Sequence, residues 1–194
     1  MSKSQDSFWR SPKGQDEYER LLDFHYAKFM KSASKVDQLE GPSFDLLVLN
    51  DFPTPQLVTT ITRGLSHFLL QKPNERKWVR QELAWSYRGD SNSLIANSLI
   101  EIGDRLLTSM TAVAPLEVCE NIVALRATPR LQHALAFIGL WLDEDEYFLD
   151  GFYPTFILEL VGLTNEDRSS FQKSSERFLK KCSAGMVDYL TLTR

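Results

Sequence analysis

The sequence is poor in cysteine and in long apolar runs, and each scarcity narrows the class of protein. Only two cysteines, Cys119 and Cys182, occur in 194 residues, and the first residues lack the apolar stretch of a secretory signal. We therefore expect free thiols in a reducing, cytoplasmic compartment. No apolar run approaches the ~20 residues that cross a bilayer, so the sequence predicts no membrane segment.

Positive charge is scarce as well. Lysine and arginine number 22 against 26 aspartates and glutamates, which gives a net charge of −4. Nucleic-acid binders normally present a concentrated basic face to the phosphates, so this balance argues against that class. An acidic surface favours attraction to a basic protein partner. An apolar share of 43% is enough for the packed core of one ordinary domain.

The motifs of metal and nucleotide sites are absent from the sequence. The three histidines, His25, His67 and His133, have no paired spacing and no cysteine nearby, whereas a zinc site needs three or four converging ligands. His25 and His133 are therefore interpreted as structural. No glycine-rich phosphate loop of either common type occurs. We predict no metal, no cofactor and no enzymatic activity.

One short segment, Gly64–Phe68, resembles the start of a nucleophile elbow, Gly-x-Ser-x-Gly. Phe68 stands where the tight turn needs glycine, and Pro73 interrupts any following helix. The ordinary interpretation is a loop that leaves a strand. A serine hydrolase that uses Ser66 with His67 or His133 is kept as the third functional hypothesis.

The spacing of apolar residues predicts a loose leader over residues 1–14 and a single domain over residues 15–194. Helices are expected over Gln15–Ser32, over Ile95–Met110 and after the capping box Thr164–Asp167. Strands are expected over Phe44–Leu49, Gln56–Thr62, Trp78–Tyr87, Leu131–Trp141 and Thr155–Leu163. Three consecutive strands followed by helices and further strands indicate an α+β fold with a mixed, largely antiparallel sheet and helices packed on it.

Acidic side chains are the candidate partner-binding residues. Asp143, Glu144, Asp145 and Glu146 form a contiguous acidic turn, which is either simply solvated or a docking patch for a basic partner. Glu82 and Glu159 lie within strands, where each is either paired inside or directed to solvent. Glu82 alternates with Arg80 on the less apolar face of its strand, so we include it among the partner-binding candidates.

Several segments together resemble the Suppressor of fused domain family. Thr59–Ser66 is similar to its Thr-Leu-Val-Thr-x-Gly-Leu/Met-Ser signature, with an apolar strand before it and Arg80–Leu83 after it. Ile95–Leu107 is similar to the central helix of the family. Ile157–Glu166 resembles its closing strand and helix, with Gly162 where proline is common. The similarity covers roughly residues 40–183.

The resemblance implies a compact, non-enzymatic α/β domain that binds other proteins. A larger animal relative grips a peptide of a Hedgehog-pathway transcription factor between two domains, and this chain has no room for the second domain. Stand-alone bacterial versions look like immunity proteins that neutralise a cognate toxin. The leading hypothesis is therefore an immunity protein with a basic toxin as partner. The alternative is a regulatory or scaffold module that binds a peptide along a sheet edge.

Overall fold

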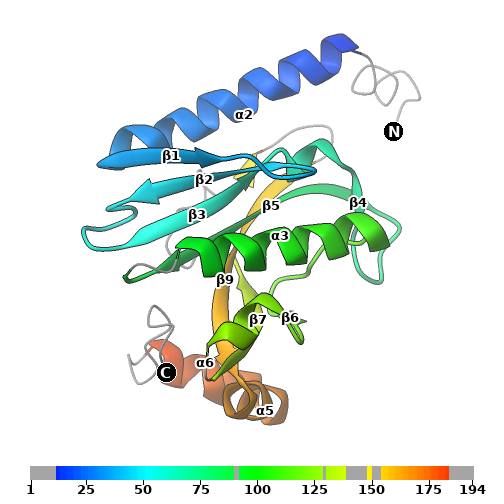
Figure 1. Cartoon of the computed structure of the whole chain (residues 1–194). Coiled ribbons are helices and arrows are strands. Elements are labelled where there is room, and N and C mark those ends of the chain that lie inside the picture. Colours follow the sequence, from blue (N-terminus) through cyan, green and yellow to red (C-terminus); the bar gives the residue numbers. More distant parts are fainter. Residues whose placement is uncertain (1–11, 90–91, 129, 139–147, 150–153, 184–194) are drawn as a thin grey trace.

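A computed structural model shows a central sheet with helices on both faces (Figure 1), and it describes residues 12–89, 92–128, 130–138, 148–149 and 154–183. The helices are α2 (Pro12–Ser32), α3 (Asn92–Ser109), α5 (Asn165–Lys173) and α6 (Ser175–Ser183), with short 3-10 turns η1 (Leu65–His67) and η2 (Ala124–Ala127). The strands are β1 (Lys35–Leu39), β2 (Asp45–Asn50), β3 (Val58–Arg63), β4 (Leu70–Gln71), β5 (Trp78–Tyr87), β6 (Val118–Cys119), β7 (Leu131–Phe137), β8 (Phe148–Leu149) and β9 (Thr155–Thr164).

The sheet has the strand order β1-β2-β3-β5-β9-β7-β6, with β4 beside β5 and β8 beside β9. Its first three strands form an antiparallel meander, because short turns join them. At the centre, β5 and β9 run parallel, with Arg80 opposite Thr155 and Trp85 opposite Leu160. The remaining pairings between described strands are antiparallel. The predicted α+β class with a mixed, largely antiparallel sheet is confirmed.

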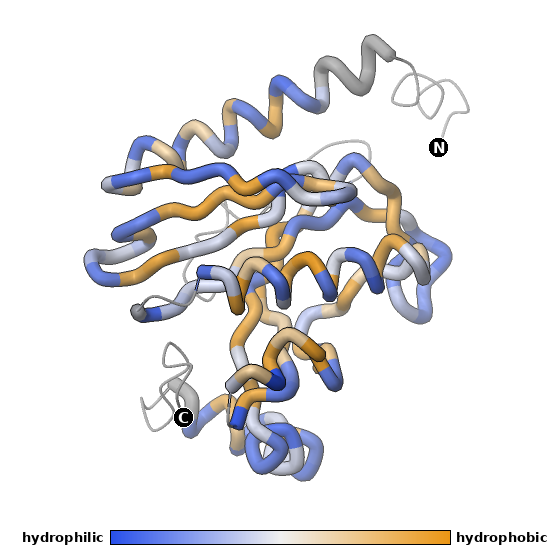
Figure 2. Tube along the Cα trace, viewed as in Figure 1, coloured by the Kyte–Doolittle hydropathy of each residue, from blue (hydrophilic) through white to orange (hydrophobic). Residues whose placement is uncertain are grey.

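Two apolar cores form because the inner strands are buried on both faces. On one face α3 packs Ile95, Leu99 and Ile102 against the sheet. On the other face α2 contributes Tyr18, Leu22, Tyr26 and Phe29. The nearly continuous apolar run of β2 serves both, with Leu46 in the first core and Leu47 in the second. Figure 2 shows apolar and polar residues alternating along α2, as a helix with one buried face requires.

β5 follows the predicted alternation, but its polar face is buried too. Val79, Leu83, Trp85 and Tyr87 all belong to the core under α3. The opposite face carries Arg80, Glu82, Ala84 and Ser86, all of them buried. Helix α2 covers this face of β5. The local sequence of β5 cannot show that a helix buries its polar side chains. Of the two alternatives left open for Glu82 and Glu159, a buried or a solvent-facing side chain, the structure therefore shows the buried one.

The C-terminal capping box is confirmed, whereas the single last helix is not. The Thr164 hydroxyl accepts from the Asp167 N–H, and the Asp167 carboxylate accepts from the Thr164 N–H. The helix stops at Ser174, which is extended, and the Ser174 hydroxyl then accepts from the Arg177 N–H at the start of α6. This break lets Phe178 pack against Leu135 and Leu163. Ser174 thus acts as a cap in the middle of the expected helix.

Other sequence predictions have mixed outcomes. Helix α2 begins at Pro12, three residues before the expected start, while residues 1–11 of the expected leader lie outside the described residues. The edge strand β1 was not predicted, because its polar sequence Lys-Val-Asp-Gln-Leu lacks an apolar pattern. Cys119 is a free thiol, as expected. Within the described ranges, no helix combines the length and apolar character needed to cross a membrane.

Candidate functional site

The most densely hydrogen-bonded polar cluster described here begins at Gly64, where β3 ends. Gly64 has a φ of 102°, a left-handed conformation that glycine adopts without the strain of a side chain. The turn reverses the chain into η1, so that the backbone N–H groups of Gly64 and Ser66 point the same way. Leu65 and Ser66 are fully buried. The Thr-x-Gly-Leu-Ser pattern therefore forms a tight loop against the sheet.

Glu82 fills the concave side of this loop. Its Oε1 accepts from the Gly64 N–H at 3.0 Å, the Ser66 N–H at 3.0 Å and the Ser66 hydroxyl at 2.6 Å, while its Oε2 accepts from the Thr62 hydroxyl. Burial raises the pKa of the Glu82 carboxyl to about 7, and the hydrogen bonds from Ser66 and Thr62 act in the opposite direction. All four partners donate, so the carboxylate form satisfies each of them.

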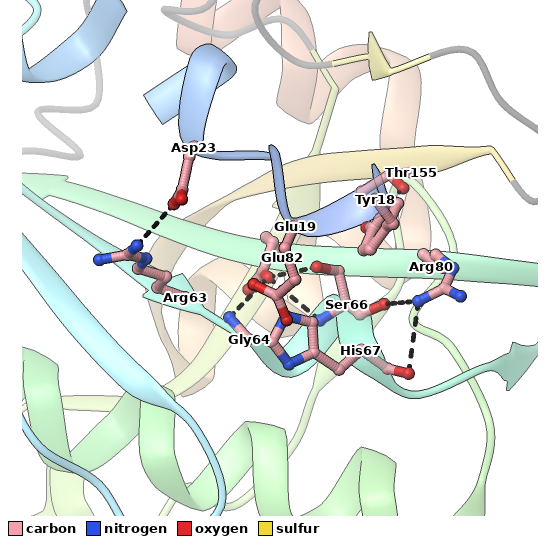
Figure 3. Close-up of polar contacts among 10 residues, drawn as sticks. All are labelled: Tyr18, Glu19, Asp23, Arg63, Gly64, Ser66, His67, Arg80, Glu82 and Thr155. Atoms are coloured by element: carbon pink, nitrogen blue, oxygen red, sulfur yellow. Dashed lines mark hydrogen bonds and ion pairs between the residues drawn. The ribbon is translucent and has the colours of Figure 1, made fainter. Parts of the chain in front are cut away.

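Helix α2 lies across the loop and closes it from above (Figure 3). The Tyr18 hydroxyl is 2.9 Å from the Thr155 hydroxyl, and the Tyr26 hydroxyl donates to the Thr62 carbonyl at 2.8 Å. The Arg80 guanidinium stacks on the Tyr18 ring at 4.1 Å and donates to the Ser66 carbonyl at 2.7 Å.

At the surface, two ion pairs continue the contact between α2 and the loop. His67 pairs with Glu19 at 2.9 Å and Arg63 pairs with Asp23 at 2.6 Å. Exposed pairs of this kind contribute little to stability, about 0–1 kcal/mol each. The arrangement as a whole fixes α2, the loop and β5 to one another.

This geometry gives Ser66 and Glu82 structural positions. Ser66 is fully buried, and its hydroxyl donates to Glu82 where a nucleophilic serine would donate to a histidine. Glu82 is also fully buried, so it presents no surface to a partner in this conformation. Any influence of Glu82 on binding would act through the loop that it holds. The acidic residues Asp143, Glu144, Asp145 and Glu146 lie outside the described residues.

His133 and His25 both occupy structural positions, as the sequence analysis expected. His133 accepts from the Asn121 N–H through Nδ1 at 3.1 Å, and its Nε2 is 2.9 Å from the Asn165 Oδ1. His25 is buried and packs edge-on against the Phe29 ring. Among the residues that the structure describes, no group of three or more histidine, cysteine or carboxylate side chains is arranged to hold a metal ion.

A cavity of about 240 Å³ lies on the other face of β5. Its walls are mostly apolar and come from β5, β9, the end of β7 and the segment 112–115, with Val79, Val113, Ala114, Pro115, Ile138, Phe156 and Leu158 among them. Gln81 also lines it, and its side-chain amide is already paired, since it donates to the Val113 carbonyl and accepts from the Val113 N–H. The cavity wall at Gln81 therefore has no amide group left without a partner.

The rim of the cavity is charged. Lys72 lies 3.1 Å from Glu75, and Glu75 is 3.3 Å from Lys77. Ile138 also lines the cavity, and the four consecutive acids begin five residues further along the chain, at Asp143. Sequence reasoning missed this cavity because five stretches of the chain build it. The alternation that places Val79 and Gln81 on one face of β5 was the available signal.

Comparisons with known proteins find similarity in the fold and no significant match in sequence. No family model matches the sequence, and no curated protein resembles it at a significant level. A solved SUFU (suppressor of fused protein) homolog from Neisseria gonorrhoeae is 16% identical, with a TM-score of 0.69 over 92% of this chain and 95% of that chain. A structure of the Sufu–Fu complex is 13% identical, with a TM-score of 0.61 over 80% and 79%. Drosophila Suppressor of Fused is 14% identical, with a TM-score of 0.55 over 77% of this chain and 42% of that one.

Proposed function

We infer that this chain, which has a Suppressor of fused-like fold, is a protein-binding domain, and that a partner places an apolar side chain in the cavity beside β5. The observation that carries the proposal is the cavity itself, with apolar walls, a paired Gln81 amide and a charged rim. An apolar pocket with a polar rim is the usual setting of the anchoring residue of a protein interface.

A side chain suits this cavity better than a metabolite does. Sites for small molecules usually measure about 300–1,000 Å³ and place several polar groups toward the ligand. This cavity measures about 240 Å³. The Gln81 amide in its wall is already paired in both directions with the backbone of Val113. One aromatic or branched aliphatic side chain matches that volume and that polarity.

We propose further that the partner is a cognate toxin, which the chain neutralises by covering its active surface. The net charge of −4 supports a basic partner, because opposite charge speeds and orients the encounter. The fold supports a binding role, since one structure that shares it is the Sufu–Fu complex.

The test is co-purification with the product of the gene immediately upstream. A stable 1:1 complex is expected, and filling the cavity with Ala114→Trp should weaken its affinity at least tenfold, or about 1.4 kcal/mol. The matched control is Ala127→Trp, since Ala127 is exposed on η2 and does not line the cavity. Equal affinities of the two variants would show that the cavity is not part of the interface. If no toxin gene lies upstream and no partner co-purifies, the proposal of a cognate toxin loses its support.

One observation favours the alternative of peptide binding along a sheet edge. Among the described strands, β1 pairs with β2 alone, so its other edge is open to an added strand. Titration with extended peptides would then shift the backbone amide signals of Lys35–Leu39 and leave the cavity residues unchanged. Shifts at Val113 and Ile138 in place of β1 would favour the cavity.

A further inference from the structure

The outer face of α2 combines exposed apolar and basic side chains. Phe24 is 72% exposed, and Leu21, one turn earlier, is 42% exposed. A helix that only covered the sheet would carry polar residues on this side. Phe24 is the most exposed of the large apolar side chains in the described residues, and its surroundings indicate what it could contact.

Three cations surround Phe24. Arg20, Phe24 and Lys28 recur every four residues and so lie along one stripe of the helix, with Lys31 a further turn on. All three basic residues are exposed. Between Arg20 and Lys31 the helix has one acid, Asp23, which lies on its flank and pairs with Arg63, whereas Asp16, Glu17 and Glu19 precede this stretch. The outer stripe is thus basic on a chain whose net charge is −4.

We propose that this stripe (Arg20, Leu21, Phe24, Lys28 and Lys31) is a second docking surface, and that it takes an acidic protein segment with an apolar side chain at its centre. The apolar side chain would pack on Phe24 and Leu21, and carboxylates would meet the cations around them. The occupant has the opposite charge to the partner expected at the cavity, so the two surfaces select different molecules.

A protein segment fits these observations better than a lipid surface. Two exposed apolar side chains bury little area, whereas helices that lie on membranes insert a whole apolar face. A bilayer would also meet a broad side of an acidic molecule, while a peptide meets the stripe alone.

The two surfaces lie on opposite sides of the sheet. The cavity is lined by Val79 and Leu158 of the α3 core, whereas α2 covers the other face. Neither partner blocks the other in this arrangement. The chain is therefore built to hold two proteins at once, one of each charge, and the second surface acts whether or not the first partner is a toxin.

The probe is a synthetic amphipathic peptide with a central tryptophan flanked by glutamates at helical spacing, titrated by NMR against the full chain. We expect shifts at Arg20, Phe24 and Lys28, and affinity that falls as salt is added. Phe24→Ala should weaken binding at least fivefold, and Arg20→Glu combined with Lys31→Glu at least tenfold. These residues are exposed, so the variants should keep the fold.

Matched controls lie elsewhere on the surface. Val123→Ala removes another exposed apolar side chain, and Arg126→Glu reverses another exposed charge; neither should change the affinity. The same peptide with glutamine in place of glutamate should bind at least tenfold more weakly.

Three outcomes would overturn the proposal. One is equal binding by the α2 variants and the wild-type chain. Another is binding to vesicles of equal parts phosphatidylserine and phosphatidylcholine with no binding to the peptide. The third is self-association that Phe24→Ala abolishes, since it would place a second copy of the chain on the stripe.

Discussion

Glu82 shows how a single buried carboxyl group can hold a loop, a strand and a helix together. Its two oxygens accept four hydrogen bonds, and each donor belongs to the segment Thr62–Ser66. Breaking such a network leaves buried donors unpaired, at a cost of about 1–3 kcal/mol for each group. From the sequence, Glu82 was a partner-binding candidate whose side chain was either paired inside or directed to solvent. The structure shows that its importance lies in the interior.

Glutamine has nearly the shape of the protonated Glu82 carboxyl but cannot ionise, so Glu82→Gln should change the free energy of unfolding little at pH 4.5, where both side chains are neutral. The pH dependence gives a sharper test. The folded pKa of about 7 lies above the ordinary value of 4.5, so this group contributes stability that is complete below pH 4.5 and lost as the pH rises through 7. The free energy of unfolding of wild type, minus that of Glu82→Gln, should therefore fall by up to about 3 kcal/mol from pH 4.5 to pH 8.

Urea unfolding at several pH values measures this gap. Groups other than Glu82 titrate in both proteins, so their contributions cancel in the difference. If this difference stays constant, or rises in favour of wild type as the pH rises, the expected direction is wrong.

Ser66→Ala separates a structural serine from a catalytic one. Loss of the hydroxyl removes one of the four donors to Glu82, so the free energy of unfolding should fall by about 1–3 kcal/mol. Ser98→Ala is the control, because Ser98 is equally buried but only donates to the Leu94 carbonyl of its own helix. The control should be nearly neutral. A hydrolytic activity that disappears in Ser66→Ala with unchanged stability would revive the serine hydrolase hypothesis.

At the scale of the elements, helix α3 contains Gly103, a glycine that should stabilise the fold more than alanine would at this position. Glycine weakens a helix by about 1 kcal/mol relative to alanine, which suggests that Gly103→Ala would be stabilising. A Cβ at Gly103, however, would lie 2.3 Å from the Phe44 ring, which is buried. Gly103→Ala should therefore destabilise the fold by about 1–3 kcal/mol through overpacking.

Two variants test the origin of that effect. Asn97→Ala, at an exposed position of the same helix, should raise stability by a few tenths of a kcal/mol. In a Phe44→Leu background, which makes room, Gly103→Ala should lose most of its penalty. A penalty that persists unchanged in that background would exclude the Phe44 contact as its cause.

The elements with strong periodicity were predictable, and the others were not. β2, β5 and β9 carry apolar residues in patterns that a strand alone explains, and the capping box located the start of α5. β1 was missed because an edge strand with Lys35 and Asp37 needs little apolar character. The two-residue strands β4, β6 and β8 are too short to show any period.

The candidate sites were less predictable, for a physical reason. The cavity depends on Val79, Val113 and Phe156 meeting in space, and no local pattern encodes such a meeting. The α2 stripe gives no signal in the hydrophobic pattern, because periodicity marks the buried face of a helix and Phe24 lies on the exposed one. Local periodicity reports what an element buries and says little about what the assembled surface presents.

At the scale of the whole molecule, the acidic turn should control the rate of encounter with a basic partner. Reversal of charge through Asp143→Lys and Glu144→Lys should slow association several-fold and flatten its dependence on salt. The control, Glu40→Lys with Glu166→Lys, makes the same change in net charge at exposed positions elsewhere. Stopped-flow kinetics against the co-purified partner measures both. An unchanged association rate in the Asp143→Lys, Glu144→Lys variant would show that the acidic turn does not steer the encounter.

The parallel pairing of β5 with β9 has a consequence for synthesis on the ribosome. β9 lies between β5 and β7, so one edge of β5 stays open until residues 155–164 have emerged. A nascent chain that stalls before that point exposes the backbone of Trp78–Tyr87 to neighbouring chains, which is a route to aggregation. The centre of the sheet closes only when β9 arrives, so folding of the sheet must wait until residue 164 has left the ribosome.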